Sequence, residues 1–141
     1  MTFSAPPAPV VLDASLAVEQ IVQSAPRGAA QWVEWIDAQR TRLVPWHFWP
    51  EVANAMLVGN RLEPSRVRQE IGLLRAEGVE SVEPHERRLI EAIGLASQHR
   101  LSVYDALYVQ LAIETDATLA TLDLAMRRAA EAEGVEIEAL D

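Results

Sequence analysis

Four acidic residues stand at positions where an α/β protein gathers a chemical site. Asp13 directly follows the apolar run V-V-L, and Asp123 directly follows A-T-L. Glu51 and Asp105 fall near the starts of two apolar helical patterns, in F-W-P-E-V and V-Y-D-A-L. Ligands of open α/β sheets collect beyond the carboxyl ends of the strands. Because the first turns of core helices often face the same rim, we expect the four carboxylates to converge there.

The chemistry of such a cluster points to a hard divalent cation. A carboxylate surrounded by apolar residues needs a compensating charge, yet no arginine lies within five residues of Asp13 or Glu51. The chain has no cysteine, and its three histidines stand in separate settings, at positions 47, 85 and 99. Oxygen ligands of this kind suit Mg²⁺ or Mn²⁺. Such ions activate water for phosphodiester cleavage, and Asp13 and Asp105 are our strongest candidate ligands.

Each acid also has a purely structural explanation. Asp13 and Asp123 could be N-cap residues of the helices that follow them. Ser102 and Asp105 nearly form a capping box, and Glu51 could be a solvated acid favoured by a helix dipole. These alternatives remain open at the level of sequence, although the apolar residues around all four acids favour a shared site.

Strand and helix patterns alternate along the chain. Short apolar runs predict strands at Val10–Leu12, Leu43–Pro45, Val79–Val82, Thr118–Leu122 and Val135–Ile137. Helical periodicity predicts seven helices. The first opens at Ser15, the second spans Trp32 to Gln39 and the third runs from Trp46 to Gly59. The fourth starts at Pro64, and the last three cover Pro84–His99, the stretch after Ser102, and Asp123–Glu133. Alternating strands and helices predict an α/β fold with a mainly parallel sheet.

Composition fits an ordinary globular protein. The 141 residues include 50% hydrophobic residues, and the formal charge is −9. We expect one domain over residues 10–141 behind a flexible, proline-rich lead-in at residues 1–9. The start lacks the features of a signal peptide and no run could span a membrane, so we expect a cytoplasmic protein. The acidic charge argues against a non-specific nucleic-acid coat, so any phosphate contact would rest on a few arginines. Candidates are Arg61, Arg66 and Arg68, although a solvated turn is the favoured explanation of these residues.

Four short motifs, in order, resemble those of PIN-domain nucleases, and among them the VapC-type toxins of bacterial toxin–antitoxin pairs. They are V-V-L-D-A-S at 10–15, P-E-V-A-N-A at 50–55, L-S-V-Y-D-A-L-Y-V-Q-L-A at 101–112 and L-A-T-L-D at 119–123. The resemblance implies a three-layer α/β/α fold in which Asp13, Glu51, Asp105 and Asp123 bind Mg²⁺ or Mn²⁺. It also implies that Ser15 and Thr121 support the site, and Asn54, one helical turn after Glu51, is a further supporting candidate.

The resemblance further implies a metal-dependent endoribonuclease that cleaves RNA, forms a homodimer and is silenced by a small antitoxin of a type II pair. The antitoxin is expected to dock on the first two helices, near Ile21, Val22, Trp32 and Trp35. Two other functions compete. A non-catalytic PIN-like domain would bind RNA or protein without needing four acids. An Asp13-nucleophile phosphatase is disfavoured because Ser15 stands where a second aspartate is common and the chain has no lysine.

Overall fold

A parallel sheet of four strands forms the centre of the computed structural model, which describes residues 5–141. The strand order is β3-β2-β1-β4, and all three pairings are parallel. The strands are β1 (Val10–Leu12), β2 (Arg42–Pro45), β3 (Val79–Val82) and β4 (Thr118–Ala120). Every residue of β1 and β4 is buried, as expected for parallel strands covered on both faces.

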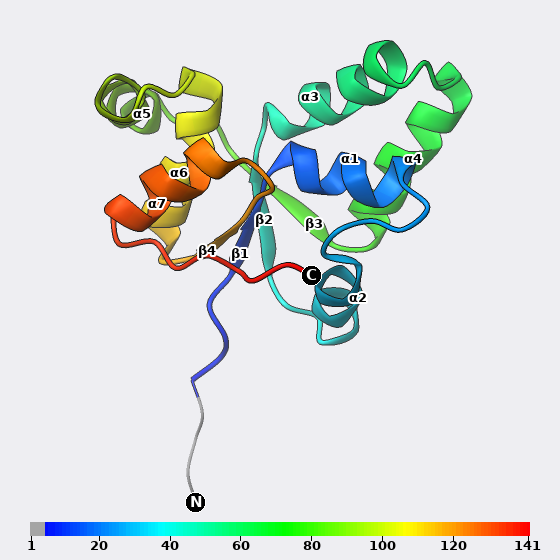
Figure 1. The fold of residues 1–141 in the computed structure, drawn as a ribbon, viewed down its shortest axis with the longest axis horizontal. Coiled ribbons are helices and arrows are strands. Elements are labelled where there is room, and N and C mark those ends of the chain that lie inside the picture. Colours follow the sequence, from blue (N-terminus) through cyan, green and yellow to red (C-terminus); the bar gives the residue numbers. More distant parts are fainter. Residues whose placement is uncertain (1–4) are drawn as a thin grey trace, which may run out of the picture.

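Helices cover both faces of this sheet, which confirms the predicted three-layer α/β/α fold (Figure 1). Helices α1 to α4 lie on one side and α5 to α7 lie on the other. Within residues 5–141, no helix is long and apolar enough to cross a membrane. The helices are α1 (Ala14–Val22), α2 (Ala29–Asp37), α3 (Phe48–Asn54), a π-helix (Ala55–Gly59), α4 (Pro64–Ala76), α5 (Glu86–His99), α6 (Val103–Thr115) and α7 (Leu124–Ala132).

Helix α6 is the central helix of the core. Tyr108, Val109 and Leu111 have no exposed surface, and the apolar residues of β1 are equally buried. The predicted burial of this helix on most of its sides is therefore confirmed. Its first turn is the exception, because the Tyr104 side chain is 65% exposed. That turn lies at the edge of the sheet where the candidate acids were expected.

The predicted last strand, Val135–Ile137, is reduced to a single bridge between Leu119 and Ile137. The cause is the alternation of backbone groups along β4, which is only three residues long. The Thr118 N–H and the Ala120 carbonyl both face β1. Only Leu119 offers its N–H and carbonyl to the C-terminal segment, where they bond Glu136 and Glu138.

The predicted helix from Trp46 to Gly59 begins two residues later, at Phe48, and changes type at Ala55. Its second half is a π-helix, which has five-residue hydrogen-bond spacing and often marks a functional position. The predicted helix around Trp32 ends at Asp37, and Gln39 lies beyond it in the left-handed region at φ 53°.

Trp32 and Trp35 belong to the core, so the docking surface predicted around them is wrong. The two side chains are 8% and 4% exposed, and their ring centroids lie 6.4 Å apart. A pair of tryptophans on one helix can serve the core or a partner, and here the monomer itself buries them.

The predicted flexible lead-in lies partly outside the described residues, since the structure describes only residues 5–9 of it. Its last two residues are anchored. The Arg40 side chain donates to the Ala8 carbonyl at 2.9 Å, and the Thr118 N–H donates to the Pro9 carbonyl at 2.8 Å. The end of the lead-in is therefore attached to the sheet.

Candidate active site

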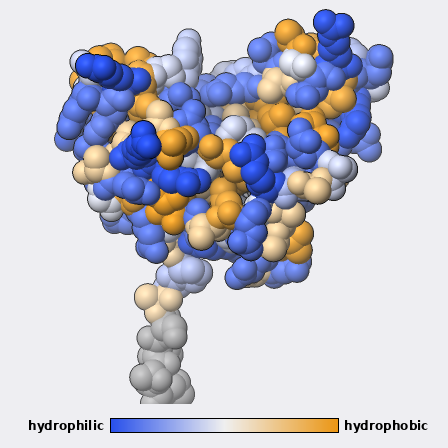
Figure 2. Space-filling view, in the orientation of Figure 1, coloured by the Kyte–Doolittle hydropathy of each residue, from blue (hydrophilic) through white to orange (hydrophobic). Residues whose placement is uncertain are grey.

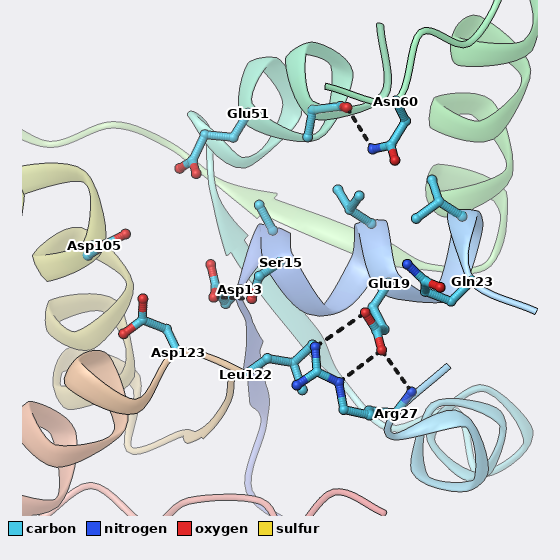
Figure 3. Close-up of a pocket in the computed structure, with 14 residues that line it drawn as sticks. Asp13, Ser15, Glu19, Gln23, Arg27, Glu51, Asn60, Asp105, Leu122 and Asp123 are labelled. Atoms are coloured by element: carbon cyan, nitrogen blue, oxygen red, sulfur yellow. Dashed lines mark hydrogen bonds and ion pairs between the residues drawn. The ribbon is translucent and has the colours of Figure 1, made fainter. Parts of the chain in front are cut away.

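All four candidate acids line one open cavity of about 580 Å³. In Figure 2 the surface is hollowed between the lobe that carries α5 and the lobe that carries α3 and α4. Figure 3 shows that the acids reach this space from four different elements. They are Asp13, Glu51, Asp105 and Asp123.

The position of Asp13 follows from strand register. Leu12 of β1 is paired with Ala120 of β4, so Asp13 and Thr121 emerge side by side at the carboxyl ends of neighbouring strands. The Thr121 hydroxyl donates to Asp13 Oδ2 at 2.7 Å, and the Ser15 hydroxyl donates to the same oxygen at 2.6 Å. Asp13 precedes α1 but makes no side-chain capping hydrogen bond. Its carboxylate therefore serves the cavity, and both predicted supporting hydroxyls contact it.

Burial raises the pKa of Asp13 above its usual value. The hydrogen bonds from Ser15 and Thr121 act in the opposite direction, and the Glu51 carboxylate raises the pKa further. Asp13 is only 4% exposed, so the cost of charging it is not relieved by water. A cation in the cavity would remove that cost.

The pKa of Asp105 is affected by all three of the other acids. Burial is the largest cause of its raised pKa, followed by the carboxylates of Asp13, Asp123 and Glu51, while a hydrogen bond with Ser102 lowers it. The N-cap of α6 is Ser102, whose hydroxyl accepts from the Asp105 N–H at 3.0 Å. The capping role considered for the Asp105 side chain thus falls to Ser102.

Asp123 and Glu51 have structural partners as well as cavity positions. Asp123 caps α7, because its Oδ1 atom accepts from the Met126 N–H at 2.8 Å. The N-cap role considered for Asp123 is therefore correct for that oxygen. Glu51 Oε1 accepts from the Tyr108 hydroxyl at 3.2 Å and lies 3.0 Å from His47 Nε2. In each case one carboxylate oxygen is used by the protein and the other has no such bond.

The donor set suits a hard cation, although the acids do not form a closed ligand cage. In residues 5–141, no three His, Asp or Glu side chains are already close enough together to hold a metal ion. Like charges that share a poorly solvated space keep apart when no cation lies between them. Four carboxylates around one cavity, two of them with raised pKa values, fit Mg²⁺ or Mn²⁺ by ligand chemistry.

The third predicted supporting residue, Asn54, does not line the cavity and is exposed. Ala55 continues the cavity-lining face one helical turn after Glu51, and Asn60 returns to it across the π-helix. The Asn60 side chain donates to the Ala55 carbonyl at 2.9 Å. Sequence periodicity alone could not show this, because it assumes an unbroken α-helix.

The arginines predicted to contact phosphate do not line this cavity. Arg61, Arg66 and Arg68 are exposed and do not line the cavity, whereas Arg27 does. Arg27 Nε lies 2.9 Å from Glu19 Oε1, and Glu19 also lines the cavity (Figure 3). Sequence patterns gave little indication of the Glu19–Arg27 pair, because Glu19 lies in α1 and Arg27 lies in a loop eight residues later.

Comparison with known proteins agrees with this geometry. Residues 10–132 match the family model described as PIN domain. A search of curated proteins gives no match. Among solved structures, PAE2754 from Pyrobaculum aerophilum shares 20% identity, with a TM-score of 0.65 over 86% of this chain and 84% of that one.

Two further structures share the fold at lower identity. VapBC2 from Rickettsia felis, bound to a DNA fragment from its promoter, gives a TM-score of 0.73 at 14% identity over 94% of this chain and 99% of that one. FitAcB from Neisseria gonorrhoeae gives a TM-score of 0.60 at 16% identity over 92% and 96%. The family match includes all four acids and most of the chain, and this protein therefore belongs to the PIN domain family.

Proposed function

We propose that this protein is a Mg²⁺- or Mn²⁺-dependent endoribonuclease and the toxin of a type II toxin–antitoxin pair. The observation that carries the proposal is that all four candidate carboxylates line one cavity, and that burial and neighbouring carboxylates raise the pKa values of Asp13 and Asp105. Family membership supports it, because the match to the PIN domain family extends over residues 10–132 and so includes the same four acids.

In this proposal the protein's own residues hold and orient the catalytic charges. Asp13 and Asp105 are the main ligands, and Ser15 and Thr121 fix Asp13 through Oδ2 so that Oδ1 is left for a ligand. Bound Mg²⁺ or Mn²⁺ supplies activation of water and shielding of the phosphate charge. Glu51 and Asp123 each use one oxygen structurally, and their second oxygens complete the set or orient the attacking water.

Arg27 is the basic residue that lines the cavity, and it is our candidate for contact with the RNA backbone. Its side chain is 63% exposed and paired with Glu19. An ion pair this open to water is weak, so a phosphate group can compete for Arg27. The three arginines predicted from sequence, Arg61, Arg66 and Arg68, stay candidates for contacts farther along the strand.

The biological setting is also a proposal. We expect a small antitoxin as partner, a homodimer and a cytoplasmic location, as the VapC-like motifs imply. Exposed Leu89, Ile90 and Ile93 on α5 support a protein interface, because clustered apolar residues on a surface commonly mark one. Light scattering of the purified chain measures the oligomeric state directly.

The decisive experiment is cleavage of mixed RNA with Mn²⁺, with Mg²⁺ and with EDTA. Wild type should cut internally and only with metal, and Asp105→Asn should lose the activity. Asp116→Asn is a matched control, because Asp116 ends the same helix and lies outside the cavity. Cleavage that persists in EDTA, or in Asp105→Asn, refutes the metal mechanism.

A non-catalytic PIN-like domain that binds RNA or protein is the second candidate. The observation that favours it is the absence, within residues 5–141, of three acids already close enough to hold a metal ion. This candidate predicts RNA or protein binding that EDTA does not change and no cleavage with any divalent ion. The same assay therefore separates the two functions.

A further inference from the structure

His47 lies between two of the elements that carry candidate acids. It immediately precedes α3, and its Nε2 atom is 3.0 Å from Glu51 Oε1 and 3.0 Å from the Tyr104 carbonyl oxygen. Tyr104 is the residue before Asp105 in the first turn of α6. One imidazole nitrogen thus touches both the Glu51 side chain and the backbone beside Asp105.

The two neighbours of His47 Nε2 determine its hydrogen-bonding role. A carbonyl oxygen and a carboxylate oxygen both accept hydrogen bonds and cannot donate them. Nε2 must therefore carry a hydrogen, in the neutral ring as well as in the charged one. The ring is also held by the Tyr108 ring, edge to face, with centroids 4.8 Å apart. His47 is a donor fixed in place between α3 and α6.

Tyr108 donates a hydrogen bond to the Glu51 oxygen that lies beside His47. Its hydroxyl donates to Glu51 Oε1 at 3.2 Å, and the residue has no exposed surface. Burial, followed by the Glu51 and Asp13 carboxylates, raises the Tyr108 pKa, so the hydroxyl keeps its proton. Glu51 Oε1 thus accepts a hydrogen bond from Tyr108 and has His47 Nε2 as a close polar neighbour at 3.0 Å, which leaves Oε2 as the oxygen available to the cavity.

We propose that His47 and Tyr108 are positioning residues that orient the Glu51 carboxylate toward the acidic cavity and hold it beside Asp105. The proposal rests on the proposed function, in which Glu51 takes part in metal binding. Hydrogen-bond partners of metal ligands fix the ligand's orientation, and their loss typically lowers metal affinity about 10- to 100-fold. Neither residue contacts the metal or the RNA in this role.

Mn²⁺ affinity of the full chain is the quantity that tests this role, measured by electron paramagnetic resonance of free Mn²⁺ at neutral pH. His47→Ala and Tyr108→Phe should each raise the Mn²⁺ dissociation constant roughly tenfold or more. His47→Gln should restore much of the affinity, because its amide N–H₂ can donate from a position near that of Nε2. Melting in EDTA reports separately on folding.

His99→Ala is the matched control. His99 Nε2 also lies 3.0 Å from a carboxylate oxygen, that of Glu133, with a similar side-chain exposure of 15% against 16% for His47. This pair does not line the acidic cavity, so Mn²⁺ affinity should not change. A purely structural role for His47 would lower the melting temperature in EDTA and leave the affinity of the folded protein unchanged.

The outcomes separate the two proposals. If wild type binds Mn²⁺ and both His47→Ala and Tyr108→Phe bind it equally well, the positioning role is wrong and the proposed function stands. If wild type itself binds no Mn²⁺, the proposed function fails, and the positioning role fails with it. Should His47→Ala not fold, the comparison of Tyr108→Phe with wild type decides the matter alone.

Discussion

Replacement of Asp105 by asparagine should abolish activity while leaving the metal-free protein as stable as wild type or more stable. The substitution removes one negative charge from a group of four and keeps the shape of the side chain. Ser102 caps α6 through the Asp105 N–H, a bond that the substitution leaves in place. The usual cost of losing an N-cap therefore does not apply.

Two opposing contributions set the size of the effect. A first-turn acid gains roughly 0.3–1 kcal/mol from the helix dipole, and asparagine loses most of it. Against this, Asp105 is repelled by the carboxylates of Asp13, Asp123 and Glu51. Partly exposed charge pairs interact by about 0.2–1 kcal/mol each. At the middle of these ranges three repulsions outweigh one dipole contribution, so we expect a net stabilisation of about 1 kcal/mol.

The stability of the metal-free protein should also depend on pH, in the direction that mutual repulsion of the acids predicts. The folded pKa values of Asp13 and Asp105 are raised, so the folded state binds more protons than the unfolded chain between the ordinary and the raised pKa. Their contribution to stability is fully present below the ordinary value and is lost as pH rises through the folded values. Wild type should be most stable in mild acid, and Asp105→Asn should show a shallower decline.

Thermal melts at neutral pH, with EDTA and with Mn²⁺, measure these effects. A stabilisation of 1 kcal/mol raises the melting temperature of a chain of this size by roughly 3–4 °C. Mn²⁺ at a hundred times its dissociation constant should stabilise wild type by about 2.7 kcal/mol, and the mutant by much less. A mutant clearly less stable than wild type in EDTA, together with no gain from Mn²⁺ in wild type, would show that Asp105 is a structural acid.

Two further substitutions separate structure from chemistry in the same cavity. Thr121→Val removes hydrogen bonds to Asp13 Oδ2 and from the Asp123 N–H, so it should cost about 1–3 kcal/mol. It should also raise the Asp13 pKa further, which carboxyl NMR titration measures, and an unchanged pKa would contradict the assigned hydrogen bond. Asp123→Ala should cost about 1 kcal/mol through loss of the α7 cap, whereas Asp123→Asn keeps the cap. If chemical denaturation finds the two variants equally stable, the cap is not a stabilising contact.

The strands and the acids could be predicted from sequence because both depend on local patterns. Val10–Leu12 is short, β-branched and apolar, and such a run has few alternatives to a buried strand. Asp13 follows it directly, so its place at the sheet edge required only that the sheet be parallel. The family resemblance implied the supporting role of Thr121, and the register of β1 and β4 explains its contact with Asp13.

The failures come from features that are not local. Asn54 was expected at the site because it lies one turn after Glu51, but it is exposed at the end of α3, whereas Ala55 and, beyond the π-helix at Ala55–Gly59, Asn60 line the cavity. Trp32 and Trp35 form an apolar stripe that would suit a partner or a core, and only the packed fold shows that the core receives them. The position of His47 could not be predicted from sequence for the same reason, since its hydrogen-bond acceptor is the carbonyl of Tyr104, far along the chain.

The topology also explains how the fold can hold four acids in one cavity without an opposing free cation. Asp13 and Asp123 precede α1 and α7 directly, and Glu51 and Asp105 lie in the first turns of α3 and α6. Each acid therefore stands at the positive end of a helix dipole, a contribution of roughly 0.3–1 kcal/mol apiece. Parallel strands joined by helices send all of these N-termini to one edge of the sheet. The dipoles offset part of the mutual repulsion, and in the proposed function the remaining repulsion favours the binding of a divalent cation.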